Sequence, residues 1–185
     1  MTNYLTLSYK NLSAVKIYSC IQHLENKMSI FYKSQRVGKN GKEFLMYKFR
    51  TLEYGSDLDS FAQNYTKFGK FLRKWKIDEL PQLFNILKRE MNFIGPRPEE
   101  QRTIDLIPED SKQILLSVRP GLTSLSSIYF FDEEEILLTS KDPAKTYWEQ
   151  IKPMKILLDI FYIQNRSFLL RCFIIWQTIK KVIFR

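Results

Sequence analysis

The chain has 185 residues, of which 44% are hydrophobic and 26% charged, as expected for one folded domain with a real core. Its net charge of +9 favours an anionic partner such as a phosphate-bearing substrate, acidic lipid or nucleic acid. The single histidine, His23, argues against histidine-based catalysis, and Cys20 and Cys172 lack the spacing of a zinc site or disulfide framework. No apolar stretch predicts a secretory signal or a simple membrane-spanning helix.

Residues 30–50 predict a β-hairpin. Two aromatic-rich segments, 30–32 and 44–50, have the composition of short strands. Between them lies Asn40-Gly41, a dipeptide that strongly favours a tight turn between antiparallel strands.

Two short helices are expected after a polar segment, residues 53–66, that is a loop or a short helix. The first is Phe68–Trp75, whose apolar residues recur at helical spacing. The second starts at Asp78 and has an apolar face of Leu80, Leu83, Phe84 and Leu87, with Pro81 in its first turn. The sequence Gly-Pro-Arg-Pro at residues 95–98 then ends this unit rigidly.

The remainder of the chain is expected to be mainly helical. Residues 99–117 predict one helix, and Arg119-Pro120-Gly121 a turn. Residues 143–185 predict a helical tail that is broken near 165–167. The last part of this tail mixes large apolar and basic residues, which is typical either of an interfacial membrane helix or of a helix packed on the core.

The acidic pair Asp78–Glu79 allows two interpretations. Acidic residues at a helix start bond free N–H groups and complement the helix dipole, so the pair could be structural. With Lys76 and Arg73 nearby, the same locus could bind an anion. We expect the pKa of Asp78 to be lowered there, which would leave an ionised nucleophile or Mg²⁺ ligand.

Two arginines lie in rigid segments suited to phosphate binding. Arg97 stands between two prolines and Arg119 precedes Pro-Gly. Their guanidinium groups match phosphate oxygens in a bidentate manner, although each could equally form a salt bridge.

Five sequence blocks, in this order, resemble the bacterial sugar transferase family, the monotopic phosphoglycosyl transferases. The blocks are Phe31–Lys42, Tyr47–Leu52, Gly69–Asn85, Met91–Glu99 and Arg119–Ser124. The resemblance implies a compact, mainly helical α/β (α+β) catalytic domain with a small β-hairpin or sheet and membrane-associated amphipathic helices.

The resemblance also implies an activity: transfer of a phosphosugar from a UDP-sugar to undecaprenyl phosphate, with release of UMP. Asp78 would be the nucleophile, carrying a covalent phosphosugar and contacting Mg²⁺, and Glu79 would complete the catalytic dyad. The matching basic positions of the substrate site are Arg73, Arg97, Lys48, Arg50 and Arg119. The protein would act at the cytosolic face of the bacterial inner membrane, in glycoconjugate biosynthesis, as a peripheral or monotopic protein without a nucleic-acid partner.

The first 29 residues depart from the family pattern. Members begin with a hydrophobic re-entrant helix broken near Ser-Pro, whereas residues 1–28 carry several charges and no Ser-Pro. We therefore divide the chain into an atypical segment, residues 1–29, and a catalytic domain, residues 30–185. Two alternatives follow: a truncated, inactive paralogue or misassigned gene start, and a basic module that binds membranes or nucleic acid.

Overall fold

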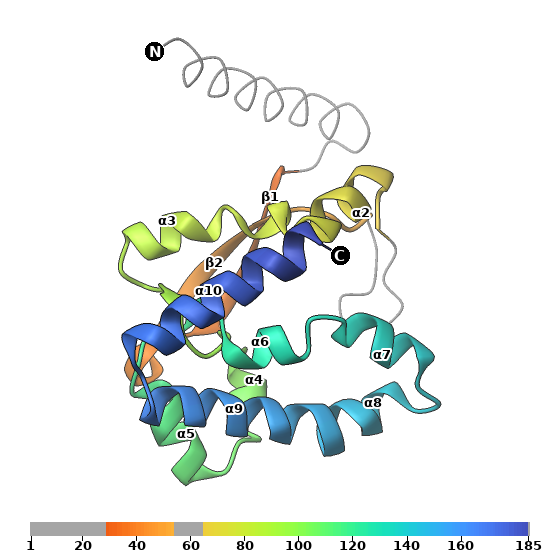
Figure 1. Ribbon diagram of the computed structural model, residues 1–185. Coiled ribbons are helices and arrows are strands. Elements are labelled where there is room, and N and C mark those ends of the chain that lie inside the picture. The colour runs from red at the N-terminus through yellow and green to blue at the C-terminus, as the bar shows by residue number, and fades with distance from the viewer. Residues whose placement is uncertain (1–28, 54–64, 185) are drawn as a thin grey trace.

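The described part of the chain begins with an antiparallel hairpin (Figure 1). The structure is a computed structural model that describes residues 29–53 and 65–184. Strand β1 (Phe31–Val37) pairs with β2 (Glu43–Phe49) from Phe31 opposite Phe49 to Val37 opposite Glu43. At the turn, Asn40 and Gly41 have φ angles of 57° and 76°, a left-handed conformation that Asn and Gly tolerate best. The predicted hairpin is confirmed.

Helix α2 (Lys67–Lys74) follows and confirms the first predicted helix. Thr66 caps its N-terminus by accepting a 2.9 Å hydrogen bond from the N–H of Gly69. Leu72 is its buried apolar residue, whereas Phe71 and Trp75 are exposed. Residues 54–64, which hold most of the expected polar segment, lie outside the described residues.

The prediction of a helix starting at Asp78 is wrong. Ile77–Glu79 forms a single 3₁₀ turn (η2), and helix α3 (Gln82–Leu87) begins only after Pro81. Lys76, at φ 54° and ψ 20°, has left-handed backbone angles that end the preceding helical path and redirect the chain. Asp78 therefore lies in a tight turn between α2 and α3 and not at the cap of a longer helix.

Helix α3 is attached to the hairpin by a buried asparagine and by Ile86, which packs against Phe44 and Met46. Asn85 is fully buried, its Oδ1 accepts a hydrogen bond from the N–H of Tyr47, and its Nδ2 donates to Leu45 O. The residues expected as its buried apolar face are instead exposed: Leu80, Leu83, Phe84 and Leu87.

Two short strands form a parallel pair that the sequence did not predict. Strand β3 (Asn92–Ile94) lies beside β4 (Gly121–Thr123), and the N–H of Gly121 donates to Pro96 O at 2.8 Å. Gly95 and Gly121 let the two backbones approach so closely that a side chain at either would collide with the opposite main chain. The pairing brings the two rigid Pro-containing segments together.

The single helix expected over 99–117 is divided in two. Helix α4 (Gln101–Ile104) ends before Pro108, and α5 (Glu109–Leu116) starts directly after it. Pro108 disfavours helical angles at the residue before it and cannot donate a backbone hydrogen bond, so the helix restarts there.

Six helical elements complete the described chain. They are α6 (Leu125–Tyr129), α7 (Glu133–Thr139), α8 (Pro143–Thr146), the π-helix η3 (Tyr147–Ile151), α9 (Lys152–Gln164) and α10 (Phe168–Ile183). Helix α9 packs on α5 and α6, and α10 packs on α6, β3 and β4 (Figure 1). The predicted break near residues 165–167 is confirmed, since α10 starts anew at the cap Ser167.

Helix α10 packs on the core, which was one of the two expectations for the tail, and it also exposes much of its apolar surface. Ile174 is fully buried in a core cluster with Ile128, Tyr162 and Ile163. Most of its other large apolar side chains are exposed: Phe168, Leu169, Phe173, Ile175, Trp176, Ile179 and Ile183. Within the described ranges, no helix is both long enough and apolar enough to span a bilayer. The mainly helical α+β class is confirmed.

Candidate active site

A cavity of about 840 Å³ opens beside the η2 turn. Its walls come from β2, α2, η2, the segment after β3, and the α6–α7 and η3–α9 regions. Of the residues predicted from the sequence, the cavity collects Lys48, Arg73, Asp78, Glu79 and Arg97. Five positions spread over 50 residues of sequence thus line one space.

Glu79 is the most strongly paired residue of the site. Its Oε1 atom lies 3.1 Å from Lys48 Nζ and 2.9 Å from an Arg97 guanidinium nitrogen. Burial alone would raise the pKa of Glu79, but the charges of Lys48 and Arg97 hold it well below its ordinary value. Glu79 is therefore a fixed carboxylate anion that orients two cations.

Asp78 has the opposite character. It is 4% exposed, and its Oδ1 is the buried side-chain oxygen for which the described residues supply no hydrogen-bond partner. Burial raises the pKa of Asp78 above its ordinary value, while the nearby charges of Lys48, Arg73 and Lys76 act in the other direction. The predicted lowering of this pKa is wrong, because η2 is a single turn and burial outweighs the cations.

The cations around the dyad differ in how firmly they are held. Burial lowers the pKa of Lys48, although Glu79 opposes this effect. Burial likewise lowers the pKa of Lys76, whose ammonium lies 5.3 Å from the centre of the Phe131 ring. The left-handed backbone at Lys76 is a sparsely populated conformation, and such backbone angles are common next to reacting groups.

Arg73 is held at the edge of the cavity by two contacts that the sequence did not predict. Its guanidinium lies 3.0 Å from Glu134 Oε2 and 4.5 Å from the centre of the Tyr65 ring. Although burial acts to lower the pKa of Arg73, Tyr65 and Glu134 raise it above its ordinary value. An anionic ligand entering the cavity would compete with Glu134 for this guanidinium.

The far wall of the cavity carries two further ion pairs. Lys152 Nζ lies 2.6 Å from Glu99 Oε1, and Lys155 Nζ lies 2.7 Å from Glu133 Oε2. Burial would raise the pKa of Glu99, but Lys152 holds it below its ordinary value. This wall is polar, buried and internally neutralised.

Two predicted residues lie elsewhere. Arg50 donates a 3.1 Å hydrogen bond to Ser29 O and lies over the Tyr32 ring. Arg119 is exposed, and neither arginine is among the residues that line the cavity. Their contact with substrate remains a prediction.

Several cavity residues were missed by the sequence argument, among them Glu99, Glu134 and Tyr147, whereas Lys76 was expected near Asp78. The acidic run at 132–135 was visible in the sequence, but nothing in it indicated that Glu133 and Glu134 would meet cations of α9 and α2. These pairings join residues far apart in the chain, so only the fold specifies them.

The donor set suits a magnesium ion held mainly by a substrate. The described residues contain no cluster of three or more carboxylate, His or Cys side chains that could hold a metal alone. Asp78 offers one unpartnered buried oxygen. Mg²⁺ commonly binds through one or two protein carboxylates together with substrate phosphates, and Asp78 fits that role.

The sequence of this domain matches a known protein family. The sequence model of bacterial sugar transferases matches residues 5–185, which is almost the whole chain. The chain belongs to the bacterial sugar transferase family, as the five sequence blocks indicated. The match includes most of residues 1–29, whose designation as an atypical segment remains a prediction.

Individual relatives agree with this assignment. A UDP-N-acetylgalactosamine-undecaprenyl-phosphate N-acetylgalactosaminephosphotransferase of Aeromonas hydrophila is 32% identical, covering 86% of this chain and 37% of that protein. The sugar transferase EpsL of Bacillus subtilis is 34% identical, covering 83% of this chain and 70% of its own. An undecaprenyl-phosphate glucose phosphotransferase of Komagataeibacter xylinus is 33% identical, covering 87% of this chain and 30% of that protein. The chain thus spans about a third of two of these relatives.

Proposed function

We propose that this protein transfers a phosphosugar from a UDP-sugar to undecaprenyl phosphate through a covalent intermediate on Asp78. The observation that carries the proposal is the buried, unpartnered Asp78 oxygen beside a cavity lined by Lys48, Arg73, Lys76 and Arg97. Cations around a carboxylate provide what attack on an anionic phosphate requires. The names of the relatives supply the sugar and the lipid class.

The chemistry proceeds in two displacements. In the first, an Asp78 carboxylate oxygen bonds to the phosphorus that bears the sugar, the diphosphate P–O bond breaks, and UMP leaves. In the second, a phosphate oxygen of undecaprenyl phosphate attacks the same phosphorus and the bond to Asp78 breaks, which restores the carboxylate and forms the lipid diphosphate sugar. Only the ionised carboxylate is nucleophilic. The charges of Lys48, Arg73 and Lys76 oppose the effect of burial on the pKa of Asp78 and therefore favour the first step.

The remaining residues would orient and neutralise. Glu79, held by Lys48 and Arg97, fixes both cations on the cavity wall, where they would meet the donor phosphates. We further propose that Asp78 would hold Mg²⁺ together with the substrate, and that the ion would supply additional charge neutralisation.

We also propose a peripheral or monotopic location at the cytosolic membrane face. Helices α3 and α10 expose large apolar side chains, including Leu87 and Phe168, which are 78% and 79% exposed. Exposed apolar patches of this kind mark interaction surfaces, and a net charge of +9 adds attraction to anionic lipid. Such a surface would keep the protein where its lipid acceptor resides.

The test is UMP release by the purified chain from UDP-N-acetylgalactosamine and UDP-glucose, with undecaprenyl phosphate and Mg²⁺. Asp78→Asn should lower the rate by at least about a thousandfold, because it removes the nucleophile. Without acceptor, the wild-type chain should gain the mass of the phosphosugar, and Asp78→Asn should not.

The matched control is Asp105→Asn, an exposed aspartate outside the cavity, which should keep full activity. UMP release by Asp78→Asn at the wild-type rate would overturn the proposed nucleophile. Absence of any turnover by wild type with either donor would instead favour the inactive-paralogue alternative.

A further inference from the structure

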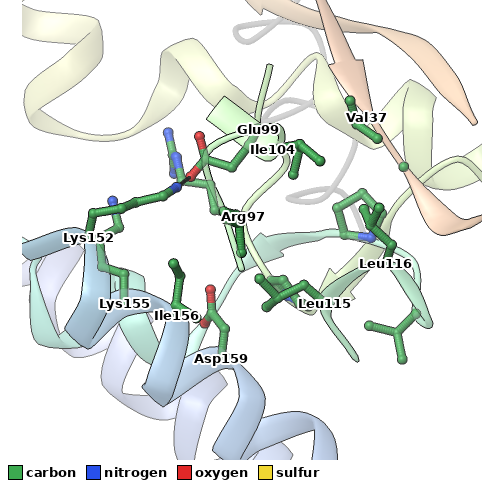
Figure 2. A pocket seen from close by; sticks show the side chains of 15 residues that line it. Val37, Arg97, Glu99, Ile104, Leu115, Leu116, Lys152, Lys155, Ile156 and Asp159 are labelled. Atoms are coloured by element: carbon green, nitrogen blue, oxygen red, sulfur yellow. Dashed lines mark hydrogen bonds and ion pairs between the residues drawn. The ribbon is translucent and has the colours of Figure 1, made fainter. Parts of the chain in front are cut away.

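A second buried carboxylate, Asp159 on α9, lies outside the proposed chemistry. It is 6% exposed and lines a separate cavity of about 30 Å³ together with Arg97, Glu99, Lys152 and Lys155 (Figure 2). Its partners are neutral: Oδ2 accepts a 3.0 Å hydrogen bond from the Ser126 hydroxyl, and the N–H groups of Ser126 and Arg97 also donate to the carboxyl group.

From Asp159 a chain of serine hydroxyls leads to the large cavity. Ser126 Oγ lies 2.8 Å from Ser124 Oγ, and Ser124 Oγ lies 2.8 Å from Ser127 Oγ. Ser126 and Ser124 are 0% and 1% exposed, so water cannot replace these contacts, whereas Ser127 lines the substrate cavity. The hydroxyl chain therefore links Asp159, which lines the small cavity, to Ser127, which lines the large one.

Counting hydrogens gives this chain two allowed directions. The three oxygen–oxygen contacts need one hydrogen each. With Asp159 ionised, the three serine hydrogens fill the three contacts only if Ser127 donates inward to Ser124. With Asp159 protonated there are four hydrogens, and the hydrogen of Ser127 is left to point into the cavity. The structure has a mixed arrangement: Ser126 donates to Asp159, Ser124 donates to Ser127, and either hydroxyl can donate in the contact between Ser126 and Ser124.

We propose that Ser127 donates a hydrogen bond to the UDP-sugar donor, and that Asp159 is the positioning residue that sets the direction of the hydroxyl chain. The inference rests on the proposed function for the identity of the donor. Ser127 acts as a hydrogen-bond donor to substrate when Asp159 is protonated, and as an acceptor when Asp159 is ionised.

The groups around Asp159 allow its protonation state, and with it the direction of the hydroxyl chain, to change in an accessible pH range. Burial raises the pKa of Asp159 to about 6 in spite of the Ser126 hydrogen bonds. Lys155, on the same helix, pairs with Glu133, and Lys152 pairs with Glu99, so neither cation forms its ion pair with Asp159. Arg97 contributes its peptide N–H. From α5, the described residues that line this small cavity are uncharged, Leu115 and Leu116.

The experiment measures the Kd of UDP-N-acetylgalactosamine and UDP-glucose by calorimetry between pH 5 and pH 8.5 in an Asp78→Asn background, which forms no covalent intermediate, alongside the KM and kcat of UMP release with Asp78 intact. With no further substitution, here the wild-type reference, we expect affinity to fall about threefold to tenfold as pH rises through about 6, the effect of one neutral hydrogen bond. Ser127→Ala should bind weakly at every pH, with kcat changed less than about twofold.

Asp159→Asn provides the decisive variant. Its amide nitrogen can donate to Ser126 and hold the chain in the outward direction, so its affinity should stay at the low-pH wild-type level throughout. Should this variant not fold, Ser126→Ala interrupts the chain and should likewise abolish the pH dependence. Ser117→Ala, an exposed serine outside both cavities, is the control and should follow wild type.

The proposal is overturned if Ser127→Ala keeps the wild-type affinity profile, or if folded Asp159→Asn still loses affinity with rising pH. Because calorimetry needs no turnover, these outcomes stay distinct from a failure of the proposed function, which would appear as donor binding without UMP release. Since all calorimetry samples carry Asp78→Asn, titration of Asp78 does not contribute to the affinity profiles.

Discussion

Glu79 and Asp159 are both almost fully buried carboxylates, yet their protonation behaviour is opposite. Glu79 contacts Lys48 and Arg97, and these charges hold its pKa low against the effect of burial. Asp159 contacts hydroxyl and peptide groups, and burial raises its pKa to about 6. The charge of the immediate partners, and not the depth of burial, decides whether a carboxylate stays ionised.

The two environments suit different tasks. The Glu79 region concentrates permanent charge at the cavity wall, which is useful for holding a diphosphate. The Asp159 region is made of neutral hydroxyl and peptide groups. The molecule thus has fixed charge at the cavity wall and a neutral hydrogen-bond network around Asp159.

The largest effect on stability should come from removing the Glu79 carboxylate. Glu79→Gln leaves Lys48 and Arg97 without their buried anion, so the free energy of unfolding should fall by about 3–5 kcal/mol. Urea unfolding measures this change in the free energy of unfolding. Glu109→Gln removes an exposed ion pair and should leave stability nearly unchanged. Equal effects of the two variants would contradict the difference drawn between buried and exposed pairs.

The next effect concerns the pH dependence of stability through Asp159. A folded-state pKa raised from 3.8 to about 6 gives stability that is complete below about pH 4 and is lost as pH rises through 6. This shift corresponds to about 3 kcal/mol. Relative to Asp159→Asn, wild type should therefore lose about that much between pH 4 and pH 8 in urea titrations. Parallel pH profiles for the two proteins would refute the raised pKa.

Arg97→Lys should separate the role of shape from that of charge. Lysine keeps the positive charge but lacks the planar fork that contacts Glu79, so kcat/KM for UMP release should fall about tenfold to a hundredfold. Arg119→Lys, outside the cavity lining, serves as the comparison and should stay within about twofold of wild type. A comparable loss in Arg119→Lys would support its sequence-predicted contact with substrate.

The smallest effect is expected at the apolar surface. Trp176 is 64% exposed on α10, so Trp176→Ser should leave the melting temperature nearly unchanged. Co-sedimentation with anionic liposomes should weaken about tenfold, from the loss of about 1.5 kcal/mol of apolar burial. Gln113→Ser, an exposed change on α5, should sediment as wild type does. Unchanged sedimentation of Trp176→Ser would exclude α10 as a membrane contact through this residue.

Local signals in the sequence determined several elements correctly. Asn40-Gly41 specified the hairpin turn because few residues tolerate left-handed backbone angles. The helical spacing at residues 68–75 predicted α2, and the polar residues 165–167 predicted the break before α10. The five blocks also identified the family, whereas the catalytic role that they imply for Asp78–Glu79 remains a prediction.

What the sequence could not determine were the contacts between distant segments and the environments that they create. Parallel pairing of β3 with β4 fixes the start of the segment that carries Arg97 to Glu79, and Glu134 reaches Arg73 from 61 residues away. The expected apolar face of α3 became exposed because the buried side chain Asn85 anchors that helix. The pKa of Asp78 was predicted in the wrong direction for the same reason: helical spacing is local, whereas burial and ion pairing depend on the tertiary structure.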